Sequence, residues 1–285
     1  MVRNFDDEPT GQDSPFGMPD NYQPNPGEEL RQIRREAMEY PSSSGEEEKK
    51  EEKMSQKRIV LRQANPSDID AIVALDHEVW PYFPTTYEKI ESRIRVFPEG
   101  NYVVVCDGEI VGYTCTQLVQ YDLDAHPPFT WEEITDHGTL KQSHNLKNPY
   151  LYGVVISVSP RFQNLGIGTR LMLPGWYNGV RYNVKAALFG CRMPDYHKVC
   201  DKYTPDEYIH LRRDDGQLYD SELRLNEREG FKIICVLPEY EKDPESCNCG
   251  VLVVHNNPLH NKLFGWIRHA IAWIILKYGH RILKV

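Results

Sequence analysis

Residues 151–173, with the sequence LYGVVISVSPRFQNLGIGTRLML, constrain the fold of this 285-residue chain more than any other segment. The apolar run at 151–158 is rich in β-branched residues, which predicts a buried strand that ends at Pro160. A loop with Gly166 and Gly168 follows, and Thr169 begins a stretch typical of a helix. In such a strand–loop–helix unit, backbone N–H groups and the positive end of the helix dipole converge on one point. The segment therefore predicts a phosphate or pyrophosphate site.

Two common phosphate-binding loops do not fit this segment. A Walker-type loop needs a lysine and then a serine or threonine directly after its last glycine, whereas Gly168 is followed by Thr169 and Arg170. The dinucleotide fingerprint needs a third glycine at the position that Leu171 occupies.

The pattern that remains is V-x-P-x-x-Q-x-x-G-x-G, and it resembles the acyl-CoA-binding motif of the GNAT acyltransferases. It consists of Val158, Pro160, Gln163, Gly166 and Gly168. The resemblance implies an α/β fold of the GNAT type, with a mixed, mostly antiparallel central sheet that is flanked by helices and splayed at the acyl-CoA site. It also implies acetyl-CoA or a related thioester as cosubstrate. The alternative is a tight turn between strand and helix that binds no ligand.

The resemblance assigns roles to individual residues. Backbone N–H groups around Ile156 and Val158 would polarise the thioester carbonyl. The pyrophosphate would bind the main chain of Gln163, Asn164, Leu165, Gly166, Ile167, Gly168 and Thr169, with Arg170 close to a phosphate.

The catalytic acid is less clear from the sequence. Many GNAT enzymes place a tyrosine four residues before the Gly-Phe pair of the next-to-last strand, and here that position is Asn226. We therefore consider Tyr196, in the CRMPDYHK segment, and Glu132, in TWEEITDHGTL, as catalytic candidates. Each could instead be a surface charge or a group that anchors a loop. The aromatic run at 80–83 could line an acceptor pocket or pack in the core.

Several segments resemble one GNAT branch, which in bacteria is fused ahead of carbon–nitrogen hydrolases. They are TWEEITDHGTL, the 151–172 segment, CRMPDYHK, YTPDEY and GFKIICVLPEYEKDPES, so that the similarity spans about 58–256. The residues after 256 are too few to hold such a hydrolase. The expected function is transfer of an acyl group from acyl-CoA to an amine. Two alternatives remain open: a non-catalytic acyl-CoA-binding sensor or scaffold, and a partner of a separate carbon–nitrogen hydrolase.

Composition predicts three regions. Residues 1–57 are rich in Pro, Gly and Ser and carry 14 acidic and 8 basic side chains, so we expect a disordered acidic tail. Residues 58–256, which carry the resemblance, are expected to form the acyltransferase domain. The net charge of −9 argues against a nucleic-acid partner. Seven scattered cysteines favour reduced thiols rather than disulfides or a metal site, and the amino terminus lacks a signal-peptide core, so we expect a cytoplasmic protein.

Within 58–256, periodicity predicts the element order β-α-α-β-β-β-α-β-α-β-β. Strands are expected near 58–64, 101–106, 109–118, 151–158, 185–191, 231–237 and 250–255, and helices near 66–79, 86–97, from 169 onward and up to 230. The Asp107-Gly108 pair predicts a hairpin turn. Residues 122–149 and 192–220 are expected to be loop-like.

The segment 257–285 predicts a basic amphipathic helix. An apolar face formed by Phe264, Ile267, Ile271, Ile274, Ile275, Tyr278 and Ile282 runs along residues 263–285, which also contain two tryptophans. Arg268 and His269 interrupt the roughly 20 apolar residues that a spanning helix needs. Two interpretations stay open: peripheral contact with a membrane surface, and a helix docked on the domain or on a second subunit.

Overall fold

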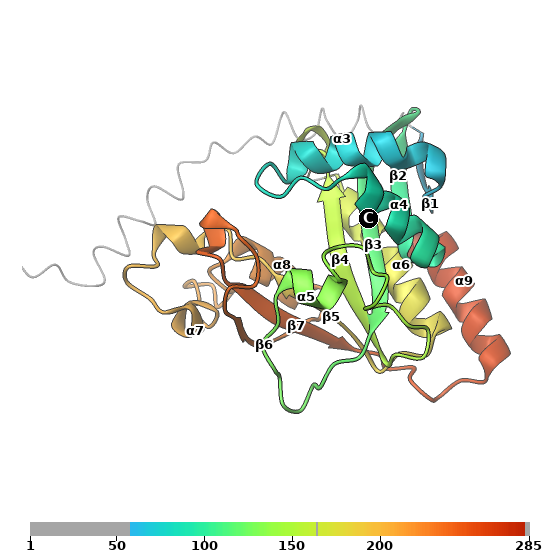
Figure 1. Cartoon of the computed structure of the whole chain (residues 1–285). Coiled ribbons are helices and arrows are strands. Elements are labelled where there is room, and N and C mark those ends of the chain that lie inside the picture. Colours follow the sequence, from blue (N-terminus) through green and yellow to red (C-terminus); the bar gives the residue numbers. More distant parts are fainter. Residues whose placement is uncertain (1–57, 164, 283–285) are drawn as a thin grey trace, which may run out of the picture. The chain divides into compact units, whose positions relative to one another are not determined.

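The computed structural model describes residues 58–163 and 165–282, and these residues belong to one compact unit. The predicted tail at 1–57 and Asn164 lie outside the described residues. Seven strands form one sheet in the order β1-β2-β3-β4-β5-β7-β6 (Figure 1). The strands are β1 Ile59–Gln63, β2 Asn101–Cys106, β3 Glu109–Val119, β4 Tyr150–Val158, β5 Ala186–Cys191, β6 Lys232–Leu237 and β7 Gly250–Asn256. This mixed, mostly antiparallel sheet confirms the predicted fold class.

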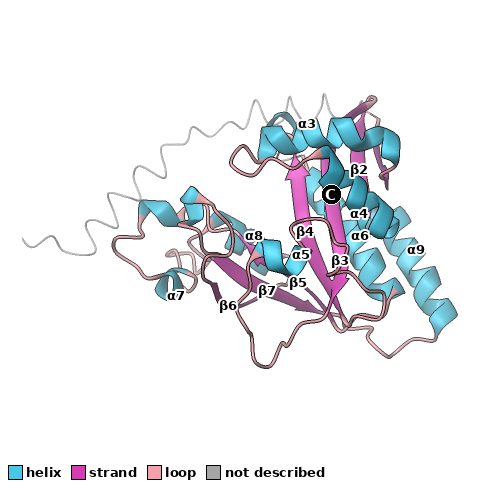
Figure 2. Ribbon diagram, in the orientation of Figure 1, coloured by secondary structure: helices cyan, strands magenta, loops and turns pink. Residues whose placement is uncertain are grey.

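Helices account for most of the remaining regular structure, as Figure 2 shows. The α-helices are α3 Ile69–Val79, α4 Tyr87–Val96, α5 Trp131–Thr135, α6 Ile167–Arg181, α7 Pro205–Tyr208, α8 Ser221–Arg228 and α9 Gly265–Ile282. Short 3-10 helices cover Pro66–Asp68, Pro98–Gly100, Pro160–Phe162, Tyr196–Lys198 and Pro244–Ser246. Among the described helices, none is long and apolar enough to cross a membrane.

Local sequence signals explain most of these elements. The Asp107-Gly108 turn has positive φ at both residues (50° and 92°), which is the geometry of a two-residue hairpin turn. Asn65 caps the first helical turn through a capping box with Asp68, and the Thr86 side chain caps α4. The predicted hairpin and first two helices are therefore confirmed.

Three local predictions need correction. The segment 192–220 is not all loop, because α7 and the 3-10 helix Tyr196–Lys198 form within it. The segment 122–149 is not all loop, because α5 forms within it behind a capping box of Thr130 and Glu133. This helix is only five residues long, too short for a periodic apolar pattern. Helix α6 begins at Ile167 rather than Thr169, since Gly166 adopts a left-handed conformation (φ 70°) that ends the loop two residues earlier.

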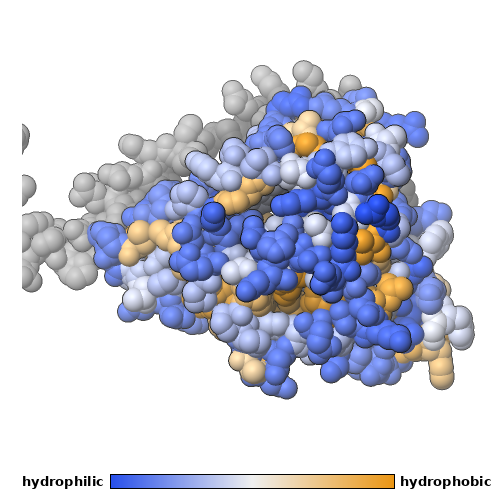
Figure 3. Space-filling model, viewed as in Figure 1, coloured by the Kyte–Doolittle hydropathy of each residue, from blue (hydrophilic) through white to orange (hydrophobic). Residues whose placement is uncertain are grey.

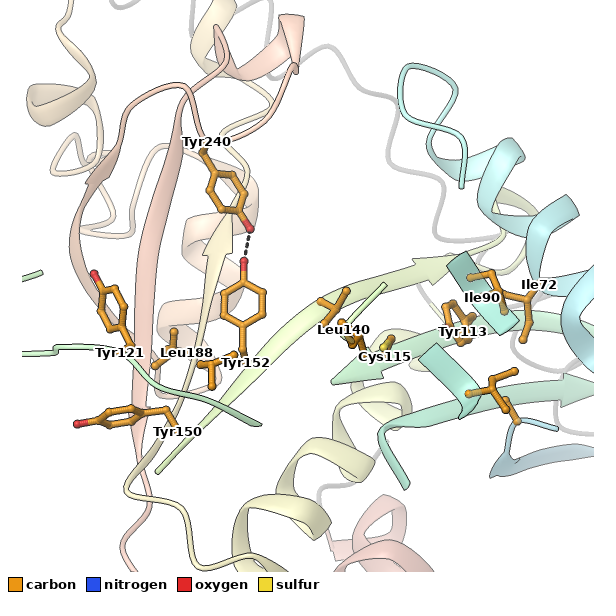
Figure 4. Close-up of a cluster of buried hydrophobic side chains, with 14 of the residues drawn as sticks. Ile72, Ile90, Tyr113, Cys115, Tyr121, Leu140, Tyr150, Tyr152, Leu188 and Tyr240 are labelled. Carbon is orange, nitrogen blue, oxygen red and sulfur yellow. Dashed lines mark hydrogen bonds between the residues drawn. The ribbon is translucent and has the colours of Figure 1, made fainter. Parts of the chain in front are cut away.

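Helices cover both faces of the sheet. Tyr113 and Cys115 of β3 pack in one core cluster with Ile72 of α3 and Ile90 of α4 (Figure 4). The neighbouring Gly112 faces the other way, because successive strand residues alternate between faces. A Cβ at Gly112 would lie 2.9 Å from Leu171 of α6. Thus α3 and α4 lie on one face, α6 lies on the other, and α9 runs beside α6 (Figure 1).

The feature of the sheet that matters most for function is the separation of β4 from β5. These two strands are parallel and pair only over Tyr150–Tyr152 and Ala186–Leu188. Beyond Tyr152, β4 keeps pairing with β3 up to Val158, while β5 continues with β7 up to Cys191. We call the resulting gap the splay. Residues 153–158 of β4 therefore have no ladder partner on the β5 side.

Candidate active site

The loop before α6 has the geometry of an anion cradle. Gly166 is the N-cap residue of α6, and no side chain caps this helix. By contrast, the side chains of Thr130, Thr204 and Asp220 cap α5, α7 and α8. The N–H groups of the first turn of α6 are therefore left for another acceptor. A Cβ added to Gly168 would meet no atom within 4 Å, so there is open space directly beside these groups.

Other predicted residues of the cradle surround this open space. Gln163 is exposed, and Leu165, Thr169 and Arg170 are half-buried. Ile167 is buried against Gly112, so only its main chain can contribute to ligand binding. The Nε atom of Arg170 is buried without a hydrogen-bond partner, which leaves a donor unsatisfied beside the cradle. The cradle thus offers open space and unpaired donor groups, as a pyrophosphate site requires.

The open edge of β4 begins with a β-bulge. Cys115 of β3 pairs with Val155 and Thr116 pairs with Gly153, so Val154 has no partner residue on β3. The indole of Trp131 donates a hydrogen bond of 2.9 Å to the Val154 carbonyl oxygen and holds the bulge in place. Ile156 is 40% exposed although it lies on a central strand, because β5 has already diverged. Ile156 and half-buried Val158 therefore lie on the unpaired edge, where the thioester was predicted to bind.

A pocket of about 140 Å³ lies where β4 and β5 end. Parallel strands end at the same edge of a sheet, so the residues that follow β5 face the end of β4 across the splay. The α3–α4 segment, the residue after β5 and the β6–β7 loop line the pocket with Val79, Trp80, Pro81, Tyr82, Phe83, Arg192, Glu241, Asp243 and Glu245. The aromatic run at 80–83 is thus pocket lining rather than core, and Tyr82 is 65% exposed.

A chain of hydrogen bonds connects this pocket to β4. The Trp80 indole donates to the Ser157 hydroxyl (2.8 Å), which in turn donates to the Asp76 carboxylate (2.9 Å). Asp76 is 4% exposed, and burial raises the pKa of its carboxyl group. These two hydrogen bonds fix α3 and Trp80 to the part of β4 that has no partner on the β5 side, and they thereby position the aromatic wall of the pocket.

Glu241 is a carboxylic acid of the pocket whose pKa is strongly raised. Burial, with a further contribution from the nearby Asp243 carboxylate, raises the pKa of Glu241 to about 7. Arg192 opposes this shift only in part, because its guanidinium binds Asp243 at 2.7 Å and 2.9 Å and Glu245 at 2.7 Å. A carboxylate with a pKa close to neutral is suited to accept a proton at physiological pH.

A pair of tyrosines lies at the start of the splay. The hydroxyl of Tyr240, in the β6–β7 loop, is hydrogen bonded to the hydroxyl of Tyr152, the last β4 residue that pairs with β5 (Figure 4). The Tyr240 ring lies directly on Gly190 of β5 and Gly250 of β7, where any Cβ would overlap it. Burial raises the pKa of both phenols, so both hydroxyls keep their protons at neutral pH.

The two catalytic candidates from the sequence lie elsewhere. Tyr196 is buried and donates its hydroxyl hydrogen to the Tyr203 carbonyl oxygen (2.9 Å), which anchors the 192–220 segment. Glu132 is exposed on α5 and lies 3.5 Å from His137, although it is close enough to Glu241 to raise the pKa of that residue. Asn226, at the usual tyrosine position, donates to the Cys191 sulfur and the Glu222 carbonyl oxygen. Neither Tyr196 nor Glu132 lines the pocket.

Sequence reasoning did not single out Arg192, Glu241 or Tyr240, although signals for them existed. Arg192 is the second residue of CRMPDYHK, and Tyr240 and Glu241 lie within GFKIICVLPEYEKDPES. Both segments carry the family resemblance, so their polar residues were the natural ones to examine. In the described residues, no group of three or more His, Cys, Asp and Glu side chains could hold a metal ion.

Comparison with known proteins identifies the family of this chain. The model of the acetyltransferase (GNAT) family matches residues 69–173, which include the cradle and the unpaired edge of β4. The uncharacterized N-acetyltransferase YkwB of Bacillus subtilis (strain 168) is 32% identical over 209 residues, which cover 72% of this chain and 91% of YkwB. This chain belongs to the GNAT family. It transfers an acyl group from acyl-CoA, as the match of the family to the observed site implies.

A second curated relative matches this GNAT protein over only part of its own length. The probable hydrolase YhcX of Bacillus subtilis (strain 168) is 32% identical over 207 residues, which cover 71% of this chain but 39% of YhcX. This similarity agrees with the predicted GNAT branch. Because the match covers only part of YhcX, it does not indicate hydrolase activity in this chain.

Two solved structures resemble the GNAT fold of this chain over nearly their whole length. The loading GNATL domain of CurA from Lyngbya majuscula is 25% identical, with a TM-score of 0.59, and covers 70% of this chain and 98% of the domain. The GphF GNAT-like decarboxylase, solved in complex with isobutyryl-CoA, is 25% identical, with a TM-score of 0.58 and coverage of 69% and 98%.

Proposed function

We propose that this GNAT protein acylates a cationic amine, with acetyl-CoA or a related short thioester as donor, and that Glu241 is the general base. The observation that carries the proposal is the pocket at the end of the splay, where Glu241 has a pKa of about 7. Glu241, Asp243 and Glu245 line this pocket with one cation, Arg192, which two of them bind. The pocket is thus left with negative charge that attracts an ammonium group.

An amine acceptor needs a base before it can attack. A lysine-like amine has a pKa near 10.4, so its free base at pH 7 costs roughly 4.6 kcal/mol. Glu241, with a pKa of about 7, is partly ionised at neutral pH, so it is available within the pocket to take the proton of the amine as the C–N bond forms. The walls formed by Trp80 and Phe83 contact the apolar part of the acceptor and exclude water.

The transfer then proceeds at the unpaired edge of β4. The amine nitrogen attacks the thioester carbonyl carbon, and backbone N–H groups of residues 153–158 stabilise the oxyanion. The C–N bond forms, the C–S bond breaks, and the CoA thiolate takes a proton. We assign this proton to the Tyr240 hydroxyl, because it lies at the start of the splay and its raised pKa keeps it protonated.

The test is release of CoA thiol by the full chain, with acetyl-CoA and longer acyl-CoAs against pooled amines, amino acids and peptides. We expect acceptor-dependent release that Glu241→Gln lowers by about 10²-fold or more. Glu239→Gln is the matched control, because Glu239 is an exposed carboxylate two residues away and outside the pocket. Tight acyl-CoA binding without turnover for any acceptor would overturn the proposal in favour of an acyl-CoA sensor.

A second candidate function is decarboxylation of a carboxylated acyl-CoA. The similarity to the GphF GNAT-like decarboxylase favours it. The surplus of carboxylates in the pocket disfavours it, since a substrate carboxylate would be repelled. Incubation with malonyl-CoA in the absence of any amine distinguishes the two functions. Acyl transfer predicts no release of CO₂, and decarboxylation predicts CO₂ and acetyl-CoA in equal amounts.

A further inference from the structure

Helix α9 has one face that packs on the domain and a second face that does not. On the packed face, Ala272 is fully buried and Gly279 lies against α6, where a Cβ would be 2.6 Å from Leu173. Small residues at these positions let the two helices approach closely. This packing agrees with the docked-helix interpretation for one face, and Ala272 and Gly279 were not among the residues of the predicted apolar face.

The unpacked face is apolar and exposed. Trp266 is 76% exposed, Trp273 is 52% exposed and Ile274 is 44% exposed. Together with exposed Ala270 and Lys277, they follow the spacing i, i+4, i+7, i+8 and i+11, which places all five on one side of the helix. We call these five residues the tryptophan face. Phe264, just before the helix, is 77% exposed as well.

Figure 3 shows one side of the molecule coloured by hydropathy. Most of the surface seen in this view is hydrophilic. Two large, exposed tryptophans on one helix face mark an interaction surface rather than ordinary scatter of apolar residues.

The charge of the segment indicates which partner the tryptophan face binds. Residues 259–285 contain five basic side chains and no acidic one, in a chain with a net charge of −9. Lys277 lies on the face itself, with its ammonium group 4.5 Å from the centre of the Trp273 ring. Tryptophan beside lysine on an amphipathic helix is the combination that binds the headgroup region of anionic lipids.

We propose that the tryptophan face binds the surface of an anionic membrane while the opposite face stays packed on α6. The helix then lies in the plane of the interface and does not insert as a free peptide. Salt screens the repulsion from acidic groups that are farther from the membrane than a Debye length of about 8–10 Å. Binding should therefore need anionic lipid, the tryptophans and moderate salt together.

The test is sedimentation of the full chain with two kinds of vesicle. One contains phosphatidylcholine alone, and the other also contains phosphatidylserine as about one lipid in three. We expect binding to the anionic vesicles only, a fall of about tenfold or more in the W266S/W273S double variant, and further loss at high salt. Leu225→Ser is the control, because Leu225 is another exposed apolar residue (44%), on α8. Both variants should keep the wild-type melting temperature, since the replaced side chains are exposed.

Two results would overturn the proposal. One is equal vesicle binding by the wild type and the double variant. The other is a wild type that ignores anionic vesicles and sediments as a dimer that W266S/W273S converts to a monomer, which would make a second copy of the chain the partner. Either result leaves the acyltransfer proposal untouched, because thiol release is measured without lipid.

Discussion

The hydroxyl oxygens of Tyr152 and Tyr240 lie 2.5 Å apart, at the point where β4 and β5 separate. The two residues are 88 positions apart in the chain. Tyr152 ends the pairing of the parallel strands, and Tyr240 comes from the loop that also supplies Glu241 to the pocket. This contact therefore connects the unpaired edge of β4 to the loop that lines the pocket. The proposed acid, Tyr240, and the proposed base, Glu241, are neighbours in that loop.

Loss of open space at the cradle should abolish CoA binding. Gly168→Glu places bulk and a negative charge beside the uncapped first turn of α6, where a pyrophosphate would bind. Calorimetry with CoA should show no measurable binding by this variant, while its circular dichroism stays that of the wild type. Gly168→Ala is the control. It adds a methyl group to open space, so unchanged CoA affinity is expected, and equal affinity of the Glu variant would refute the cradle.

The two buried tyrosines should differ in their effect on catalysis. We expect Tyr240→Phe to lower turnover by roughly 10²-fold, with acyl-CoA affinity nearly unchanged, because it removes the proposed donor to the thiolate. Tyr196→Phe should leave turnover close to wild type, since its hydroxyl only anchors the Tyr203 carbonyl. Each variant loses one buried hydrogen bond and should cost about 1 kcal/mol of stability. A larger loss of turnover in Tyr196→Phe would restore Tyr196 as the acid.

Activity should depend on the ionisation of Glu241. Because this carboxylate must be deprotonated to act as base, kcat/KM should rise with pH through about 7 and then level off. Measurement of the pH–rate profile with a saturating acyl donor checks this expectation. If kcat/KM of Glu241→Gln is lower at every pH but rises through the same pH range as in the wild type, the ionisation belongs to another group.

The same group should leave a signature in stability. The pKa of Glu241 is about 7 in the folded protein, above the usual value of 4.5, so the folded state holds a proton that the unfolded state has lost between these pH values. Its contribution to stability therefore falls as the pH rises through this window. In melting curves from pH 4 to pH 8, the melting temperature of Glu241→Gln should rise relative to that of the wild type as the pH increases.

Arg192 should set the position of the pH profile. Its positive charge lowers the pKa of Glu241 and compensates Asp243 and Glu245. Arg192→Gln should therefore move the rising limb of the profile toward higher pH, whereas Arg192→Lys should move it less. A limb that stays in place in a folded Arg192→Gln variant would contradict this electrostatic coupling.

The packed face of α9 should be sensitive to volume, in contrast to its tryptophan face. Gly279→Leu forces a side chain against Leu173 and should destabilise the fold by about 1–3 kcal/mol in denaturant titrations. Stability equal to that of the wild type would mean that α9 does not pack on α6 through this position.

What the sequence alone determined is local. The strand at 150–158, the loop with Gly166 and Gly168, and the helix that follows are contiguous, so one motif predicted the anion cradle and, through its family resemblance, the splayed fold. The turn at Asp107-Gly108 and the cap at Asn65 are likewise set by neighbouring residues. Such features follow from backbone conformation and from hydrogen bonds over a few positions.

The tertiary structure decided the rest. The pocket combines residues from α3, the end of β5 and the β6–β7 loop, and Glu241 acquires its pKa only through burial beside Asp243 and Arg192. Likewise, the apolar pattern of α9 did not reveal which side packs, because Leu173 of α6 selects the side with the small residues. Burial and charge at a given atom depend on long-range neighbours, and the fold brings these together only when the whole sheet has formed.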